Sequence, residues 1–407
     1  MKIKFLSLYF IYFLDLMGMV FVYVVLSPLI VDSSSMLPPS TSLATRNVIV
    51  GLLFATYPLA QFFAAPILGD LSDRFGRRII LIISTLGTSA AIALSGVSII
   101  ASSLSLLFIS RFVSGLFAGN LTVAQATVAE SAPNEKQEQY MSLFSAVGGM
   151  SWTTGPFIAA LLSDQTLVGF FDFATPFWFL AIATFIGFLL ILWKVDETRQ
   201  REAGQRLDLH KVAENLLSVF QIRSVIHPFI ASLITIFGWM MYQGFLASYL
   251  IEKFQYTERW EGYAYAISSL FWMLGGLLTA RILKHHSARK LIIIPLILSG
   301  ISVFCYLFTF RSYTVWPLLA IANFTQSMVT ACFFGIFARL VPPENHGKIF
   351  GSWNAGFALA STLGPFLSGI FVRFQINLPY FIAAIIMIAT AIYYLIWYKK
   401  SNLNDTT

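Results

Sequence analysis

The sequence predicts an all-α integral membrane protein whose twelve transmembrane helices form two pseudo-symmetric six-helix bundles. Its 407 residues are 57% hydrophobic and 11% charged, with a mean hydropathy of +0.76, well outside the range of soluble domains. A run of about 20 apolar residues crosses a bilayer core. Twelve such runs occur, at 4–30, 47–68, 78–101, 104–129, 139–163, 176–195, 226–251, 260–283, 290–310, 315–340, 349–372 and 379–398.

The net charge of +7 reports topology rather than binding to nucleic acid. With the N-terminus inside, twenty of the 26 Lys and Arg residues fall on cytoplasmic segments, five fall on outer loops, and Arg111 lies within a helix. This positive-inside bias predicts that both termini are cytoplasmic. The first run is too long for a signal-peptide core and lacks a small-residue cleavage site, so we expect it to be retained. The compact loops favour a bacterial inner membrane.

The only long polar stretch divides six spans from six. We expect an N-terminal bundle at 1–195, a cytoplasmic linker at 196–225, and a C-terminal bundle with a short cytoplasmic tail at 226–407. An internal repeat supports this division, because residues 131–160 align with 340–369 at an offset of 209. Parallel repeats of this kind are typical of transporters that bind substrate near the membrane midplane.

Asp15 lies in the first apolar run, about 11 residues from its cytoplasmic end, a depth of ~16 Å along a helix. A carboxylate at that depth costs several kcal/mol unless it is paired or protonated, and acids there usually mark proton or ion paths. A fixed structural ion pair is the alternative. We expect Asp15 to exchange a proton.

Residues 69–78 read Gly-Asp-Leu-Ser-Asp-Arg-Phe-Gly-Arg-Arg between two apolar runs, which predicts a short charged hairpin turn at the membrane surface. This order of glycines, acids and bases resembles the signature loop between helices 2 and 3 of the major facilitator superfamily of secondary transporters. The resemblance implies that Asp73, Arg77 and Glu130 form a charge relay that holds an inner gate shut, with simple inward-loop topology as the alternative. The residues concerned are Gly69, Asp70, Asp73, Arg74, Gly76, Arg77, Arg78 and, at the inner end of helix 4, Glu130.

Arg111 lies roughly 7 residues, or ~10 Å, below the outer end of helix 4, so it and Asp15 can occupy similar levels. The guanidinium stays charged and could modulate Asp15 without losing a proton. The stretch from Arg111 to Gly119 resembles the superfamily's helix-4 motif, which is associated with proton coupling. A structural tie between helices 1 and 4 is the alternative.

Helix 5 is rich in small residues around a Gly-Pro pair, and helix 11 repeats the pattern. Small residues allow close helix approach, and a proline weakens the helical hydrogen-bond ladder. The segment resembles the helix-5 motif of drug/proton antiporters, although ordinary close packing explains the small residues about as well. The residues are Gly148, Gly155, Pro156, Gly364 and Pro365.

Uncharged polar and aromatic side chains are the candidate lining of a substrate cavity, although amides in membrane helices more commonly join neighbouring helices. They are Gln61, Asn120, Gln125, Trp239, Tyr242, Gln243, Asn323, Gln326, Trp353 and Asn354. The second half offers no deeply placed charge, which argues against a strongly anionic substrate. The stretch FLDLMGMVF, Gln61 and the helix 2–3 loop are similar to tetracycline/proton antiporters, which makes Asp15, Gln61 and Arg111 the residues to test.

Catalytic, zinc-binding and Walker motifs are absent, so we expect no enzyme activity, no metal and no cofactor. The sequence predicts a monomeric, proton-coupled secondary transporter that moves a small amphipathic or drug-like molecule by alternating access, most simply as an exporter. A proton-coupled importer of a nutrient or siderophore is one alternative. A non-transporting membrane receptor or scaffold is another, although a scaffold has no use for an acid at mid-membrane.

Overall fold

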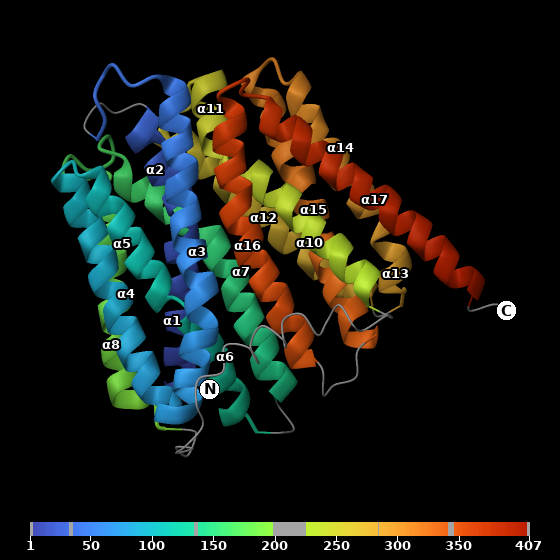
Figure 1. Ribbon diagram of the computed structural model, residues 1–407, viewed down its shortest axis with the longest axis horizontal. Coiled ribbons are helices and arrows are strands. Elements are labelled where there is room, and N and C mark those ends of the chain that lie inside the picture. The colour runs from blue at the N-terminus through green and yellow to red at the C-terminus, as the bar shows by residue number, and fades with distance from the viewer. Residues whose placement is uncertain are drawn as a thin grey trace. The chain divides into compact units, whose positions relative to one another are not determined.

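The computed structural model describes residues 3–31, 36–133, 137–197, 225–283, 285–340 and 346–404, which form helices joined by short loops and turns (Figure 1). The chain divides into two compact units. Unit 1 comprises Met1–Asp208 with Tyr256–Tyr263, and unit 2 comprises Leu209–Gln255 with Ala264–Thr407. Apart from its first two residues and its last, the linker expected at 196–225 lies outside the described residues.

Unit 1 is built on a layer in which α4 packs against both α5 and α8. In the same unit, α3 contacts α5, while α1 contacts α7 and α8 (Figure 1). The helices are α1 (Ile3–Val20), α2 (Val22–Val31), α3 (Leu43–Phe75), α4 (Arg77–Ile100), α5 (Leu104–Phe117), α6 (Asn120–Ser131), α7 (Gln137–Ser163) and α8 (Thr175–Lys194).

Unit 2 is built around α10, which packs against α16 and α17, while α14 packs against α15 and α17. Its helices are α10 (Ile226–Gly244), α11 (Leu246–Phe254), α12 (Glu258–Ile282), α13 (Ala288–Leu291), α14 (Ile293–Cys305), α15 (Val315–Leu340), α16 (His346–Val372) and α17 (Leu378–Asn404), with 3₁₀ turns η3 (Tyr306–Phe308) and η4 (Ser312–Thr314). The first residues of α12 are grouped with unit 1.

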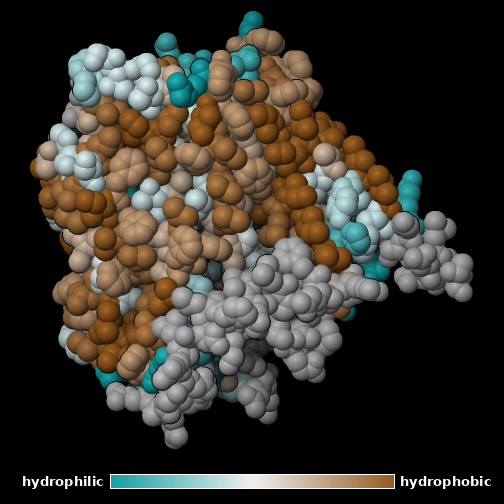
Figure 2. Space-filling model, in the orientation of Figure 1, coloured by the Kyte–Doolittle hydropathy of each residue, from teal (hydrophilic) through white to brown (hydrophobic). Residues whose placement is uncertain are grey.

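Eleven of the twelve predicted spans are, within the described residues, helices long and apolar enough to cross a membrane. The remaining one, predicted at 139–163, forms the 27-residue helix α7. Figure 2 shows apolar side chains over much of the visible face and polar ones gathered near the helix ends. Exposed residues such as Ile83 and Ile182 would be costly in water, so this surface fits a bilayer.

Four of the predicted spans are interrupted rather than continuous within the described residues, and the ninth span is interrupted at Ile292, between α13 and α14. The first divides into α1 and α2 at Phe21, the fourth into α5 and α6 at Ala118 and Gly119, and the seventh into α10 and α11 at Phe245. At the break in the fourth span, the side-chain N–H of Gln61 donates to the carbonyl of Ala118 over 3.1 Å. Such breaks free backbone carbonyls, and in a membrane these need partners from neighbouring helices.

The ten-residue hairpin turn predicted at 69–78 is wrong in extent, because α3 continues as a helix to Phe75 and α4 begins at Arg77. An ion pair of 2.7 Å between Asp70 and Arg74, four residues apart, supports the added helical turns. Only Gly76 leaves the helical region, with φ +104°, a conformation that glycine adopts without a steric penalty. The turn is therefore a single residue.

Asp164, just past the end of α7, joins Arg259 of α12 within unit 1. Its carboxylate accepts from Arg259 Nε over 2.9 Å and from the backbone N–H of Thr166, also over 2.9 Å. The hydrogen bonds from Thr166 come first among the causes that hold the pKa of Asp164 below its ordinary value. The carboxyl group therefore stays ionised at neutral pH and keeps its ion pair.

Candidate functional site

Asp15 lies in the middle of α1 with 2% of its surface exposed. The hydroxyl of Tyr57, from α3, donates to the backbone carbonyl of Asp15 over 3.3 Å. The carboxamide of Asn120 approaches the carboxyl group, but neither carboxyl oxygen has a hydrogen-bond partner among the described residues. A buried carboxyl group without fixed partners is one whose protonation responds to any change in its surroundings.

Arg111 is equally buried, at 1% exposure, but it forms no ion pair with Asp15. Its Nη1 donates to the carbonyl of Gly18 over 3.2 Å, and its guanidinium lies 4.7 Å from the ring centroid of Tyr57. The cation is therefore stabilised by a backbone dipole and an aromatic face. Tyr57 contacts both Asp15 and Arg111, so the direct pairing that the sequence suggested is replaced by an indirect link.

The position of Arg111 depends on small residues along one face of the fourth transmembrane span, which comprises α5 and α6. Residues 111, 115 and 119 are spaced four apart and so share one face of α5 and its extension. A Cβ on Gly115 would overlap the carbonyl oxygen of Tyr57, and one on Gly119 would lie 2.8 Å from the backbone of Ala64. These contacts bring α5 close enough to α3 for the Arg111 guanidinium to reach the Tyr57 ring.

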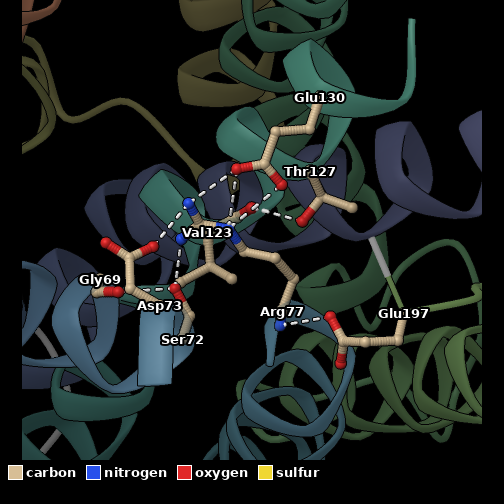
Figure 3. Close-up of polar contacts among 8 residues, drawn as sticks. All are labelled: Gly69, Ser72, Asp73, Arg77, Val123, Thr127, Glu130 and Glu197. Carbon is tan, nitrogen blue, oxygen red and sulfur yellow. Dashed lines mark hydrogen bonds and ion pairs between the residues drawn. The ribbon is translucent and has the colours of Figure 1, made fainter. Parts of the chain in front are cut away.

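A second charged cluster surrounds Arg77 at the first turn of α4 (Figure 3). Arg77 Nη2 lies 2.7 Å from Asp73 and 2.9 Å from Glu130, and Nη1 donates to the hydroxyl of Ser72. The arginine side chain is 8% exposed, whereas the two acids are 43% and 33% exposed. The structure thus brings together Asp73, Arg77 and Glu130, the three residues of the expected relay.

Glu197 is a member of this cluster that sequence reasoning missed. Its carboxylate accepts from the backbone N–H groups of Arg77 and Arg78 over 2.8 and 3.2 Å, capping the first turn of α4 (Figure 3). A Cβ on Gly76 would overlap this carboxylate. The signal available was an acid directly after the sixth span, together with a helix N-terminus that needs acceptors.

The remaining residues of the 69–78 segment have different roles. Arg78 donates from Nη2 to the carbonyl of Leu192 over 2.7 Å, which ties α4 to the end of α8. Gly69 accepts from the Ser72 hydroxyl through its carbonyl. A Cβ on Gly69 would meet nothing within 4 Å, so no close contact requires a glycine at this position.

The small residues of the fifth and eleventh spans lie at helix contacts in both units. These spans form α7 and α16. A Cβ on Gly148 would lie 2.8 Å from the Tyr12 hydroxyl, and one on Gly155 would lie 3.1 Å from Val20. In unit 2, a Cβ on Gly364 would lie 2.8 Å from Met240, and Pro365 fits against Gly244. The ordinary packing interpretation accounts for these positions.

Some of the candidate cavity residues contact neighbouring helices, and others contact their own helix. In unit 1, the side chain of Gln61 donates a hydrogen bond to the carbonyl of Ala118, between α5 and α6. Asn120 faces Asp15, and Gln125 is half-buried. In unit 2, the hydroxyls of Tyr242 and Tyr306 lie 2.8 Å apart, and Trp239 packs on Tyr242 with ring centroids 4.9 Å apart.

The other amides of unit 2 differ in exposure. Asn323 donates to the carbonyl of Leu319 over 2.9 Å, Gln243 is 6% exposed, and Asn354 is exposed. Gln326 and Trp353 line one small pocket between α10, α15 and α16. Besides Trp239 and Tyr242, these are two candidates that the structure brings together.

The expectation that the second half holds no charge deep in the membrane stays a prediction, although one acid near the membrane edge is buried in protein. Glu261, in the first turn of α12, is 0% exposed. From the sequence it lies two residues inside the predicted span and so at the membrane edge, but the helix packing of its outer turn buries it.

With this geometry established, comparison with known proteins identifies the family. The family model described as Major Facilitator Superfamily matches residues 8–288 and 229–406, which together cover nearly all of the chain. The chain belongs to the Major Facilitator Superfamily. It is therefore an integral membrane transporter and not an enzyme.

Among curated members of the Major Facilitator Superfamily, the chain is similar to drug-resistance proteins of bacteria. It is 27% identical over 323 residues to the Escherichia coli "Tetracycline resistance protein, class E", covering 77% of this chain and 76% of the relative. It is 22% identical over 371 residues to the "Multidrug resistance protein 2" of Bacillus subtilis (strain 168), covering 87% of each. These relatives are consistent with a bacterial inner membrane.

Solved Major Facilitator Superfamily structures confirm the predicted fold class. The D-xylose–proton symporter superposes with a TM-score of 0.74 at 16% identity, covering 96% of this chain and 95% of that one. At this identity the likeness speaks for the fold alone.

We expect Arg77→Gln to destabilise the protein more than Arg78→Gln does. The first change removes two ion pairs and leaves Glu130 beside a buried position, at a cost of about 1–3 kcal/mol in the free energy of unfolding. The second removes one hydrogen bond at the surface, at a cost of less than about 1 kcal/mol. Thermal unfolding of both variants in the same detergent measures the difference, and equal midpoints would contradict the cluster's role.

Proposed function

We propose that this transporter is proton-coupled and exports a small amphipathic or drug-like molecule by alternating access. The buried carboxyl group of Asp15 carries the proposal, because it lies mid-helix without a hydrogen-bond partner among the described residues. In this proposal Asp15 gains and loses the proton. A carboxyl group in that position is the usual element of proton paths in membranes.

Arg111 sets the environment of Asp15 through Tyr57 in this proposal. A change in the contact between helix 4 and α3 moves the guanidinium relative to the Tyr57 ring, and the same ring carries the hydroxyl that bonds the Asp15 carbonyl. Protonation and conformation are then linked, because each conformation binds the proton with a different free energy.

The cluster of Asp73, Arg77 and Glu130 serves as the inner gate in this proposal. Its ion pairs join the ends of three segments, α3, α4 and α6, around one buried cation. Because Arg77 is common to both ion pairs, the two pairs form or break together. The proposal includes cytoplasmic termini, which the charge bias favours.

The relatives named for drug resistance support export rather than import. Inside-out vesicles from cells that express the chain test this, with the lumen acidified by respiration and a lumenal pH dye as the readout. For an exporter, tetracycline or another compound from a drug panel is expected to enter the vesicles and release lumenal protons. A protonophore should abolish the accumulation.

Vesicles of the opposite orientation provide the control. Acid-outside uptake in right-side-out vesicles, with no response in inside-out ones, would show an importer instead. Absence of proton-linked movement in both orientations, across the panel, would contradict proton-coupled transport.

A further inference from the structure

The second half of the chain carries a copy of the charged 69–78 segment that has lost its acids. Residues 280–292 read ARILKHHSARKLI, with four Lys or Arg residues, two His residues and no Asp or Glu. In the first copy, Arg74 pairs with Asp70 over 2.7 Å. The second copy cannot form such pairs within its own segment.

The rest of unit 2 offers few acids to these bases. Among its described residues the single acid is Glu252, which lies in α11, about 25 residues from His227 at the other end of the same span. Exposed bases lie where α12 and α17 end and in α13 between them in sequence; they are Arg281, Lys290 and Lys399. Within the part of the chain that the structure describes, this end of unit 2 is basic and complementary to an anionic surface.

Two of the basic side chains at this end lie beside one indole. The guanidinium of Arg289 lies 6.0 Å from the ring centroid of Trp397, and the imidazole of His227 lies 6.1 Å from it between centroids. The two bases come from separate helices, α13 and α10, and the indole comes from the last turns of α17. Residues distant in sequence therefore converge on one small patch.

Tyrosines of α17 hold this patch in place. The rings of Tyr394 and Trp397 lie 5.4 Å apart between centroids, and the Tyr394 hydroxyl donates to the carbonyl of Arg289 over 3.3 Å, which ties α13 beside α17 (Figure 1). The Tyr393 hydroxyl lies 2.6 Å from Nδ1 of His227. When that hydroxyl donates its proton to Nδ1, the imidazole presents its other nitrogen, Nε2, as an N–H donor.

Apolar side chains continue from the patch along the neighbouring helices. Ile396, next to Trp397 on α17, is 64% exposed, and Ile294, in the first turn of α14, is 67% exposed. The two helices α14 and α17 pack against each other. Tryptophan at the end of such a surface is typical of the boundary between acyl chains and headgroups. A soluble anion would contact the bases alone, whereas a phospholipid contacts the bases and the apolar surface together.

We propose that Arg289, His227 and Trp397 bind the phosphate headgroup of an anionic phospholipid, whose acyl chains lie against the exposed isoleucines of α14 and α17. The guanidinium and the Nε2–H group donate charge-assisted hydrogen bonds to the phosphate oxygens. A zwitterionic lipid brings the same phosphate together with a cation, which the basic end of the unit repels. The proposed cytoplasmic termini would place this lipid in the inner leaflet, but the binding itself depends on neither the direction nor the coupling of transport.

Native mass spectrometry of the purified full chain in detergent tests the proposal, with phosphatidylglycerol and phosphatidylcholine of identical acyl chains as the probes. The wild type is expected to bind its first phosphatidylglycerol about tenfold more tightly than phosphatidylcholine. Arg289→Gln should lower this preference about fivefold, the contribution of one basic residue near an anionic headgroup. Arg281→Gln, which removes the same charge from the end of α12 outside the patch, should keep it.

Two further measurements complete the test. If Arg289→Gln fails to fold by circular dichroism and gel filtration, His227→Leu should lower the preference about threefold. Soluble sn-glycerol 3-phosphate at equal concentration should leave the lipid bound, because it has no acyl chains.

Three results would overturn the proposal. They are equal wild-type affinities for the two lipids, a preference that a folded Arg289→Gln keeps or that Arg281→Gln loses to the same extent, and displacement of the lipid by sn-glycerol 3-phosphate. Since the binding assay contains no gradient and no transported compound, each of these results leaves proton-coupled export to its own vesicle test.

Discussion

Asp15→Asn is expected to reduce proton-driven accumulation strongly while leaving the protein folded. Asparagine keeps the shape of the side chain but cannot exchange a proton, and the carboxyl oxygens that it replaces have no hydrogen-bond partner among the residues that the structure describes. A coupling free energy of the usual size predicts that gradient-driven accumulation falls by about 5- to 150-fold. Accumulation in inside-out vesicles, at matched protein levels, measures the loss.

Two comparisons isolate coupling from damage. Asp196→Asn makes the same change at an exposed acid and should leave accumulation intact. Exchange of labelled for unlabelled substrate without a gradient should persist in Asp15→Asn, because the substrate still crosses when no proton is required. Normal gradient-driven accumulation in Asp15→Asn would remove this residue from the proposed mechanism.

Gly115→Val is expected to produce the largest structural effect of a single substitution in unit 1. The new side chain would overlap the carbonyl of Tyr57 and crowd Ala60, so α5 must move away from α3. Overpacking of this kind costs about 1–3 kcal/mol, and more where the neighbour is backbone that cannot rotate aside. Displacement of α5 also takes the Arg111 guanidinium from the Tyr57 ring, so transport should fall with stability.

Gly149→Val is the matched control, because a Cβ at Gly149 would meet nothing within 4 Å. We expect its thermal unfolding midpoint to stay close to that of the wild type, whereas that of Gly115→Val should fall by several degrees. Similar midpoints for the two variants would show that the contact between helix 4 and α3 is looser than described here.

Much of the fold could be predicted because the relevant signals are local in sequence. Apolar length marks each span, and apart from the inner end of the second run the predicted runs agree with the helices to within a few residues. The helix that extends through Asp70 and Arg74 was missed, because a cluster of charges and glycines resembles a loop unless the pairs at four-residue spacing are weighed. Only Gly76, with its positive φ, was needed to make the turn.

The candidate site was predictable in its residues but less so in its contacts. Asp15 and Arg111 stand out as charges inside apolar runs, yet the sequence could not show that Tyr57 would lie between them. Glu197 joins Arg77 across 120 positions of chain, a distance at which no local pattern operates. Glu261 lies near the end of its span, where sequence gives no measure of burial.

Substrate affinity measured as a function of pH, in the wild type and in Asp15→Asn, tests the central claim most directly. The account predicts that substrate and proton bind in competition through the conformational equilibrium, so wild-type affinity changes with pH by up to about tenfold per unit. In Asp15→Asn the affinity should be independent of pH over the same range. An unchanged pH dependence in Asp15→Asn would contradict the assignment of the coupling proton to this carboxyl group.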